Sequence, residues 1–594
     1  MTSTRKMLLG TAAATMAVTG GVSTEVQAAD AMLKKAPPVQ YVRICDRYGY
    51  GFFQIPGSSI CLQLRGQVQS DNAYQGTKDI AFVGPSKTTG LYGGKSLNPI
   101  PAGGSIGNAT VQFANQQDNW GYEVTAKPRF DARTETSMGT LRAYAEIKIA
   151  LDTGNFAGCC GPGGPGGSAD FGAGTKTENY RTFLQWAGWT IGNADSIWSG
   201  GNYKTGDIAN VAPSDKSSGW TVFYTWTPSG PGAPPVKGSA PVPDGWSLSF
   251  GADTPTKHIS KQQVGGGCTY YDLALAVGSP AGAGSVCAQT GPLSVPDFVA
   301  RVHYEADAPG KDDQHTDQFG LGTIHVAGIY HQITEIVQGV PVLGAGNADG
   351  LLFPGNCGGG AACAFGPALH DHGWGVTTFV KFFVPMWAGT KLGSNRGSNM
   401  DNIQLNFNYC EAALEPCGIG ASNGNLSSGD AYWTGGLARD DMDVRTINNG
   451  VGGFYNDKEK AWVFNAQYHS ILTDCTDPVK CFILTLAYNN TQVTPGAITQ
   501  NVDWTEGGLG KANLQAYTAE ISWGTSRNGS TKPVWWRLDS EVQYRVLNQT
   551  LPCNNNGNTA IACGLPTLVP TGQSDAFHVK ANSWVYRATI TMDW

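Results

Sequence analysis

The stretch WVYRATITMDW, residues 584–594, alternates at every position between two kinds of side chain. One set is apolar or aromatic and the other mostly polar: Trp584, Tyr586, Ala588, Ile590, Met592 and Trp594 against Val585, Arg587, Thr589, Thr591 and Asp593. Successive side chains of a β-strand point to opposite faces, so the stretch predicts a strand with one apolar face. Such a face requires hydrophobic surroundings, either a packed core or lipid.

The beginning of the chain is typical of a secretory signal peptide. Arg5 and Lys6 precede an apolar stretch at 7–22, and Val26-Gln27-Ala28 forms a small-residue cleavage pattern. We therefore expect residues 1–28 to be removed. No later segment offers the roughly 20 continuous apolar residues of a transmembrane helix, so the sequence predicts export without a spanning helix.

Composition narrows the class of protein further. The chain has 80 Gly, 32 Pro, 17 Trp, 22 Tyr and 22 Phe, with only 14% charged residues and a formal charge of −7. There is no basic excess for binding nucleic acid. The alternating pattern recurs along the whole chain without a dividing linker, which favours one large domain over residues 62–594.

Period-2 alternation predicts 16 strands, an even number as in single-chain bacterial barrels. They are expected at 62–69, 120–133, 141–151, 180–187, 188–194, 220–226, 245–251, 297–306, 320–333, 373–384, 402–409, 431–440, 460–470, 512–523, 533–546 and 584–594. An apolar run at 482–488 is expected either as a hairpin inside the connection 471–511 or as part of an 18-strand variant.

Alternation alone does not separate a soluble sandwich from a membrane barrel, because both have one apolar and one polar face. Aromatic residues at the ends of apolar strands, including Trp374, Trp462, Trp584 and Trp594, match the interfacial girdles of membrane barrels. We therefore predict an all-β protein, a transmembrane antiparallel β-barrel with long extracellular loops.

Most of the 14 cysteines fall in close pairs, which predicts short-range disulfides in an oxidising compartment. The candidates are Cys45 with Cys61, Cys268 with Cys287, Cys357 with Cys363, Cys410 with Cys417, Cys475 with Cys481, and Cys553 with Cys563. Adjacent Cys159 and Cys160 are not expected to pair, because a vicinal disulfide is strained. We expect Cys45 and Cys61 to tether a periplasmic segment, residues 29–61, and every later pair to lie in an outward-facing connection.

Motifs for catalysis are weak. Residues 420–424 match G-x-S-x-G, but the strand-turn-helix context that this motif requires is missing. The acidic run at 440–443 lacks the spacing of a calcium loop. The sequence therefore predicts neither an enzyme nor a bound cofactor or metal.

Residues 41–66, YVRICDRYGYGFFQIPGSSICLQLRG, resemble the start of mature general porins of the alphaproteobacterial family. The signal junction near Ala28-Ala29 and the segment Gly139-Thr140-Leu141-Arg142 are also similar, and the resemblance covers residues 29 to about 226. It implies a 16-stranded homotrimeric barrel in the outer membrane, in contact with lipid and lipopolysaccharide, that passes ions and small hydrophilic solutes. Trp594 then serves as an assembly signal.

The resemblance also implies that the third loop, about residues 195–219, folds inward and forms a constriction. Its charged residues are Asp195, Lys204, Asp207, Asp215 and Lys216. Basic residues on the polar faces of the strands would line the opposite wall: Arg65, Arg129, Arg133, Arg142, Lys148, Arg181, Arg537, Arg545 and Arg587. A field between loop acids and wall arginines would orient solutes and set ion preference.

Two other functions remain open at this point. One is a substrate-specific channel for sugars or nutrients that uses the aromatic residues on polar faces, Tyr144, Phe183 and Phe379. The other is a surface adhesin or structural barrel whose long loops bind a partner while its lumen is plugged.

Overall fold

The structure is a computed structural model of the full chain. It describes residues 43–48, 51–83, 89–92, 119–152, 174–199, 217–228, 230–231, 245–253, 269–270, 287–290, 295–305, 320–341, 352–357, 361–384, 401–417, 444–448, 454–472, 482–496, 510–524, 535–553 and 575–594. The chain divides into two compact units, Met1–Arg43 and Ile44–Trp594. The barrel described below belongs to the second unit.

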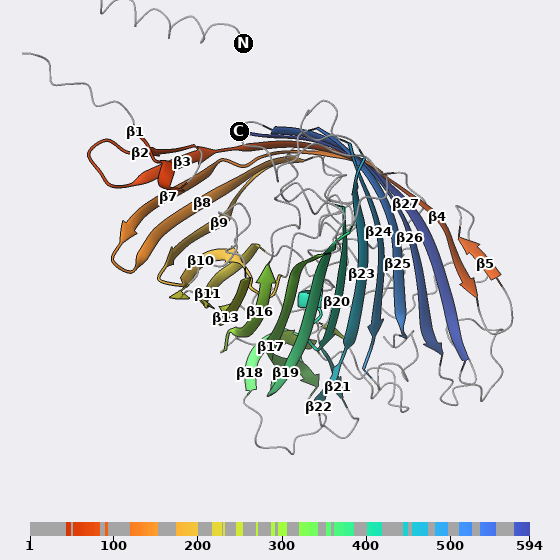
Figure 1. Cartoon of the computed structure of the whole chain (residues 1–594). Coiled ribbons are helices and arrows are strands. Elements are labelled where there is room, and N and C mark those ends of the chain that lie inside the picture. The colour runs from red at the N-terminus through yellow and green to blue at the C-terminus, as the bar shows by residue number, and fades with distance from the viewer. Residues whose placement is uncertain are drawn as a thin grey trace, which may run out of the picture. The chain divides into compact units, whose positions relative to one another are not determined.

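Sixteen barrel strands, called staves here because two of them are interrupted and carry two strand labels, form a closed antiparallel barrel (Figure 1). The first stave combines β3 (Cys61–Arg65) with β4 (Gln67–Val83), and the second combines β6 (Asn119–Ala126) with β7 (Arg129–Thr136). The others are β8 (Gly139–Asp152), β9 (Gly174–Trp186), β10 (Trp189–Asp195), β11 (Ser217–Thr227), β13 (Gly245–Asp253), β16 (Asp297–Glu305), β17 (Gly320–Pro341), β19 (Ala361–Phe383), β20 (Asn402–Glu411), β23 (Lys460–Ile471), β24 (Phe482–Thr494), β25 (Ala512–Gly524), β26 (Trp535–Cys553) and β27 (Asp575–Asp593). Pairing of β27 with β4 closes the ring.

Short elements lie outside the sixteen staves. They are β1 (Arg43–Ile44), η1 (Asp46–Tyr48), β2 (Phe52–Gln54), β5 (Thr89–Tyr92), β12 (Gly230–Pro231), β14 (Thr269–Tyr270), β15 (Cys287–Thr290), β18 (Leu352–Cys357), η3 (Glu415–Cys417), β21 (Val444–Asn448) and β22 (Phe454–Lys458). In the described part of the chain, no helix has the length and hydropathy needed to cross a membrane.

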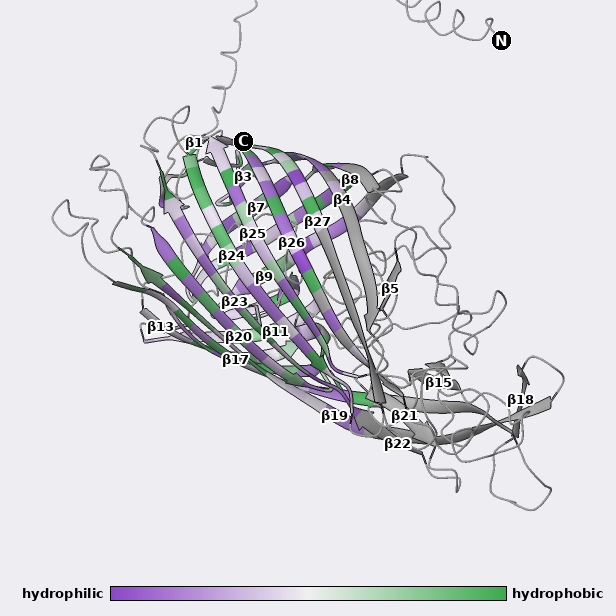
Figure 2. Ribbon diagram, turned by 90° about the vertical axis from the view of Figure 1, so that its right-hand side faces the viewer, coloured by the Kyte–Doolittle hydropathy of each residue, from purple (hydrophilic) through white to green (hydrophobic). Residues whose placement is uncertain are grey.

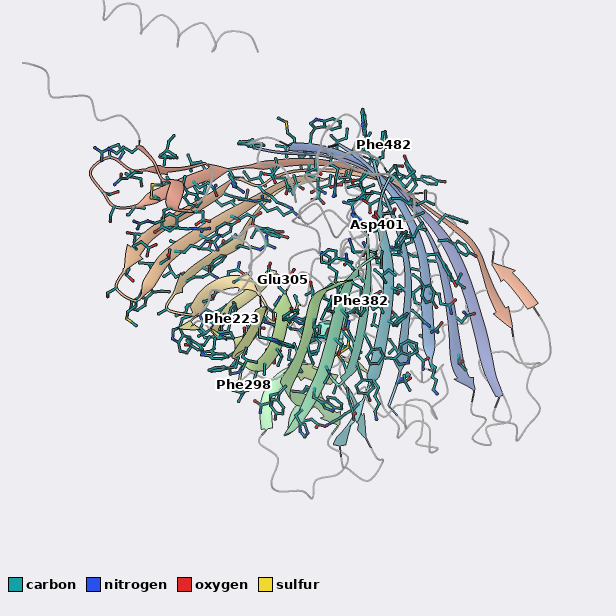
Figure 3. All side chains as sticks on the ribbon, in the orientation of Figure 1. Phe223, Phe298, Glu305, Phe382, Asp401 and Phe482 are labelled. Carbon is teal, nitrogen blue, oxygen red and sulfur yellow. A yellow bond between two sulfur atoms is a disulfide. The ribbon has the colours of Figure 1, made fainter. Side chains whose placement is uncertain are left out.

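The two faces of the staves decide between a sandwich and a membrane barrel. Hydrophobic and hydrophilic residues alternate along the strands in Figure 2. Phe298 on β16, on the outer face, is 51% exposed, whereas Phe223 on β11, on the inner face, is 1% exposed; both are labelled in Figure 3. Outward residues are predominantly apolar, while buried inward positions include many charged residues. This inverted arrangement is that of a barrel with lipid outside, as the sequence predicted.

One strand of the barrel, β24, was not among the sixteen predicted strands. The apolar run at 482–488 is neither a loop hairpin nor part of an 18-strand barrel, because β24 pairs with β23 and β25 as a full stave. The apolar alternation of β24 stops part-way, because its outer face becomes polar at Asn490. The Asn490 side chain accepts a hydrogen bond from Asn513 of β25 at 2.6 Å. The predicted strand at 431–440 lies outside the described residues. The predicted count of 16 strands is right, but the predicted set of strands is wrong because it omits β24.

The end of β23 and the start of β24 lie at one rim of the barrel. The rim with the short turns β7–β8 and β9–β10, called here the short-turn rim, also contains the C-terminal residue and the start of β4. Because β24 is a stave, β23 ends and β24 begins at this same rim, with Ile471 opposite Ile483. The predicted pair of Cys475 and Cys481 lies outside the described residues and stays a prediction.

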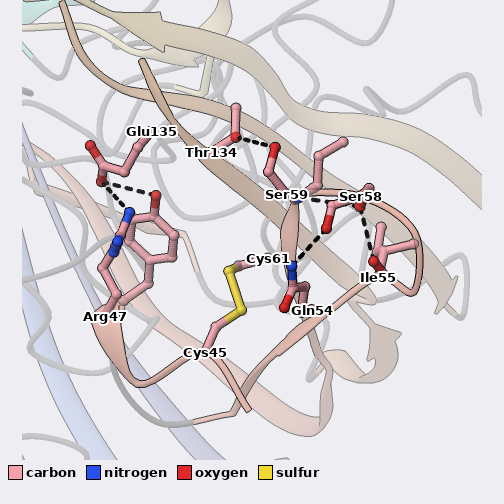
Figure 4. The surroundings of a disulfide bond; sticks show 11 residues. Cys45, Arg47, Gln54, Ile55, Ser58, Ser59, Cys61, Thr134 and Glu135 are labelled. Atoms are coloured by element: carbon pink, nitrogen blue, oxygen red, sulfur yellow. Dashed lines mark hydrogen bonds and ion pairs between the residues drawn. A yellow bond between two sulfur atoms is a disulfide. The ribbon is translucent and has the colours of Figure 1, made fainter. Parts of the chain in front are cut away.

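The N-terminal segment is fastened to the barrel by a disulfide (Figure 4). Cys45 and Cys61 are bonded, with their Cα atoms 6.1 Å apart. The bond packs against Phe52, and the guanidinium of Arg133 on β7 lies 4.9 Å from the centre of the Phe52 ring. The predicted Cys45–Cys61 disulfide is thus confirmed and packs against the inner side of the barrel wall.

A hydrogen bond adds a second attachment for this segment. The Tyr48 hydroxyl donates to Glu135 Oε1 at 3.0 Å. Partial burial, and then the neighbouring Glu135 carboxylate, raise the pKa of Tyr48 above its ordinary value. The phenol therefore stays protonated and able to donate at neutral pH.

Gly66 and Trp594 meet where the barrel closes. Their backbones exchange two hydrogen bonds of 3.0 Å each. An added Cβ on Gly66 would lie 2.1 Å from Cζ2 of the Trp594 ring. The aromatic C-terminal residue thus covers a position that only glycine can occupy without a shift of the ring.

We expect Gly66→Ala to destabilise the barrel by about 1–3 kcal/mol, the usual cost of overpacking. Gly328→Ala is the matched control, because its Cβ would approach no atom closer than Gly375 O at 3.9 Å. Loss of the folded, heat-modifiable electrophoretic form on heating would measure both variants. Equal stability of the two would contradict the role assigned to the Trp594 contact.

We expect Cys45→Ser to make the segment before Cys61 sensitive to protease while the barrel stays folded, because the disulfide closes a 16-residue separation outside the closed ring of staves. Limited proteolysis followed by mass spectrometry would locate the cuts. Alkylation of both thiols in unreduced wild-type protein would show that the bond is absent.

Candidate functional site: the charged inner wall

The register of three neighbouring staves gathers charged side chains on the inner wall. Arg133 lies opposite Arg142 between β7 and β8, and Arg129 lies opposite Glu146. Glu146 in turn lies opposite Arg181 between β8 and β9. All five point inward because they share the alternation phase of the buried residues.

Asp131 binds two of these arginines. Arg142 donates from Nε and Nη2 at 3.0 and 2.8 Å, and Arg133 donates from Nε and Nη2 at 3.0 and 2.7 Å. Arg142 also donates from Nη1 to Gln185 at 2.9 Å. One carboxylate thus separates two guanidinium groups that the register alone would place face to face.

Glu146 of β8 likewise separates two guanidinium groups. Arg129 Nε donates to Oε1 and Arg181 Nη1 donates to Oε2, both at 2.9 Å. Arg181 makes a second, two-bonded contact with Asp195 at 2.9 and 3.0 Å, and Arg129 reaches Asp593 at 3.3 Å. Ion pairs in such a buried lattice are weakly screened by salt.

Four predicted wall arginines are therefore compensated within the wall itself. The carboxylates that neutralise Arg129, Arg133, Arg142 and Arg181 lie on staves β7, β8, β10 and β27. Asp131 and Glu146 share the polar phase of the alternation, but no role was predicted for them from the sequence. Asp195 is the only predicted loop acid among the described residues, and it meets a wall arginine.

The remaining predicted wall residues are distributed around the ring. Lys148 pairs with Glu123 at 3.4 Å, Arg587 with Asp71 at 2.8 Å, and Arg537 with Asp539 at 2.7 Å, while Arg545 donates to Gln543. Arg65 is exposed. The predicted loop residues Lys204, Asp207, Asp215 and Lys216 lie outside the described residues.

The start of the third loop turns into the barrel. Ser196 donates to Asp253, and Trp198 Nε1 donates to the backbone oxygen of Pro416 at 2.7 Å. Trp198 is 1% exposed, and its backbone oxygen lies 3.2 Å from Nε2 of His325 on β17. Ser196 and Trp198 thus contact the β13 to β20 side of the wall, whereas Asp195 binds Arg181 of β9.

A second inward segment follows β20. Cys410 and Cys417 form a disulfide, and the residues between them pack with Trp198 and Phe223 in a buried apolar cluster. The sequence predicted this disulfide but not its position inside the barrel, because loop direction does not follow from spacing. Together the two segments fill part of the lumen.

The aromatic residues proposed to line a path for sugars are buried. Tyr144 and Phe183 stack at 5.0 Å between ring centres, with Arg142 over both rings, and both are buried. Phe379 is also buried. These rings stabilise the wall and offer no exposed face to a passing solute.

Comparison with known proteins matches the first third of the chain. Residues 30–231 match the family model described as the porin subfamily. This segment is similar to the porin family. Porin Omp2b of Brucella melitensis is 30% identical over 209 residues, covering 34% of this chain and 49% of Omp2b. Porin Omp2a of Brucella ovis is 28% identical over 211 residues, covering 34% and 54%. The chain thus spans about half the length of the curated relatives it matches.

Similar solved structures are also outer-membrane proteins or porins. The outer membrane channel DcaP of Acinetobacter baumannii matches with a TM-score of 0.40 and 10% identity, covering 90% of this chain and 99% of DcaP. An anion-selective porin from Comamonas acidovorans matches with a TM-score of 0.34 and 8% identity, covering 89% and 99%. The porin segment and the closed, inverted barrel place this chain in the bacterial outer membrane.

No group of three or more His, Cys, Asp or Glu among the described residues is arranged to hold a metal ion. The arrangement on the wall is one of paired charges. It can supply a polar surface to water and ions.

We expect Glu146→Gln to destabilise the barrel by about 3–5 kcal/mol, because it leaves two buried guanidinium groups without their shared carboxylate. Glu135→Gln is the matched control, since Glu135 is exposed at the end of β7. Urea unfolding in lipid vesicles would compare the two. Similar losses would contradict the importance given to the buried lattice.

Proposed function

We propose that this protein is a passive channel for ions and small hydrophilic solutes in the outer membrane. The observation that carries the proposal is the inversion of the barrel faces: charged residues such as Asp131, Arg142 and Glu146 point inward, and apolar residues point outward. A closed ring of this kind leaves no unpaired backbone edge in lipid and encloses a polar interior.

Selectivity, in this proposal, arises at a constriction between the third loop and the wall. The inward course of residues 196–199 supports it. The compensation of four wall arginines by wall carboxylates favours weak ion preference over strong anion preference, because a paired guanidinium contributes little net field to the lumen.

The resemblance to general porins supports the remaining parts of the proposal. We infer that residues 1–28 are a cleaved signal, residues 29–61 a periplasmic segment and residues 62–594 the barrel domain. We also infer a homotrimer that contacts lipid and lipopolysaccharide and performs no catalysis.

A second function is favoured by one observation. The buried cluster around Trp198, Phe223, Cys410 and Cys417 fills part of the lumen. If this filling extended across the channel, the barrel would be plugged, and the long connections would serve to bind a partner at the surface.

We expect the purified, unboiled protein to give large ohmic steps in a planar bilayer, closing in thirds, with a small reversal potential in a salt gradient. The steps follow from a polar lumen in each protomer, and the small potential follows from the paired wall. A folded protein that gives no conductance would reject the channel and favour the plugged barrel.

A further inference from the structure

Arg301 on the inner face of β16 differs from the arginines of β7 to β9. Its side chain is buried, and Nη2 donates to Ser249 Oγ of β13 at 2.9 Å. Its Nε has no hydrogen-bond partner. Within the described part of the chain, no carboxylate lies within ion-pair distance of its guanidinium, whereas Arg129, Arg133, Arg142 and Arg181 each have at least one.

Two histidines lie beside this guanidinium on the same face. His303 follows on β16, and the register places it opposite His325 of β17, with ring centres 5.7 Å apart. Both rings are buried. Neither ring nitrogen of His303 makes a hydrogen bond, nor does Nδ1 of His325.

Two acids on the same strands, Glu305 of β16 and Asp253 of β13, have other partners among the described residues. Glu305 accepts a hydrogen bond from Thr323 at 2.9 Å, and its Oε2 lies 3.5 Å from His303 Nε2. Asp253 accepts from Ser196. A buried guanidinium without a counter-charge is costly, and water can satisfy its hydrogen bonds but not its charge.

We propose that Arg301 and His303 bind a small inorganic anion on the inner wall, against His325. Arg301 supplies the charge and its free Nε–H. His303 supplies one ring N–H in either neutral tautomer, so it donates without taking up a proton. The hydroxyl pair of Ser249 and Thr225, whose oxygens are 2.8 Å apart, borders the Arg301 side of the site.

The chemistry selects a halide-sized anion. The backbone oxygen of Trp198, in the third-loop stem, lies 3.2 Å from Nε2 of the neighbouring His325, and the buried Trp198 restricts the space for a larger solute. A divalent metal is disfavoured because the fixed guanidinium charge would repel it. Bound anion would compensate Arg301 next to the place where the third-loop stem contacts the wall, so occupancy should stabilise the folded barrel.

This site does not require the barrel to conduct, so its test is separate from the bilayer measurement. Thermal unfolding of the purified full-length protein in detergent would be followed while sodium bromide replaces sodium gluconate at constant ionic strength. We expect a saturating rise of the melting temperature in wild type. Arg301→Gln should raise the half-saturating bromide concentration by about tenfold or more, because a charged hydrogen-bond partner is lost.

Arg537→Gln is the control, because it makes the same substitution on the inner face at an arginine that has a carboxylate, Asp539, at 2.7 Å. It should keep the wild-type bromide response. A non-saturating response in wild type, or an equal change in both variants, would overturn the proposal.

Crystals of wild-type protein grown in bromide provide a direct test that does not depend on a variant folding. Anomalous difference density beside Arg301 and His303 is the expected result. Density for bromide only at other sites, with Arg301 bound by water alone, would overturn the proposal.

Discussion

Backbone hydrogen bonding in lipid is the constraint on which the rest of this structure depends. An unpaired N–H or C=O group in hydrocarbon costs several kcal/mol, so a sheet can cross the membrane only when its edges meet. Here β27 pairs with β4, and the backbones of Gly66 and Trp594 complete the seam. Closure fixes the phase of every stave, because a shift by one residue would turn its charged face toward lipid.

That phase places arginines opposite one another on the inner wall, where their charges would repel. Register places Arg133 opposite Arg142, and Asp131 between them removes the repulsion. Glu146 does the same for Arg129 and Arg181. The wall is therefore a lattice of alternating charges, and Arg301, without such a carboxylate, stands out against it.

Period-2 alternation predicted the count of 16 and the shared polar phase of the nine basic wall residues, and the aromatic residues at strand ends indicated the inverted faces. The strand at 482–494 was not predicted as part of the barrel, because Asn490 and Gln492 point outward and end the apolar pattern. Neighbouring strands β23 and β25 fix that segment by pairing, and pairing between strands is not encoded in local hydropathy.

The sequence by itself determined the strand pattern, the disulfide between Cys45 and Cys61, and the porin resemblance of its first third, because each depends on residues close together along the chain. Only the tertiary structure decided which carboxylate pairs with which arginine, and that Trp198 and the Cys410–Cys417 segment turn into the lumen. These contacts join staves far apart in sequence. Their geometry follows from closure of the ring and the register between strands, which no single segment contains.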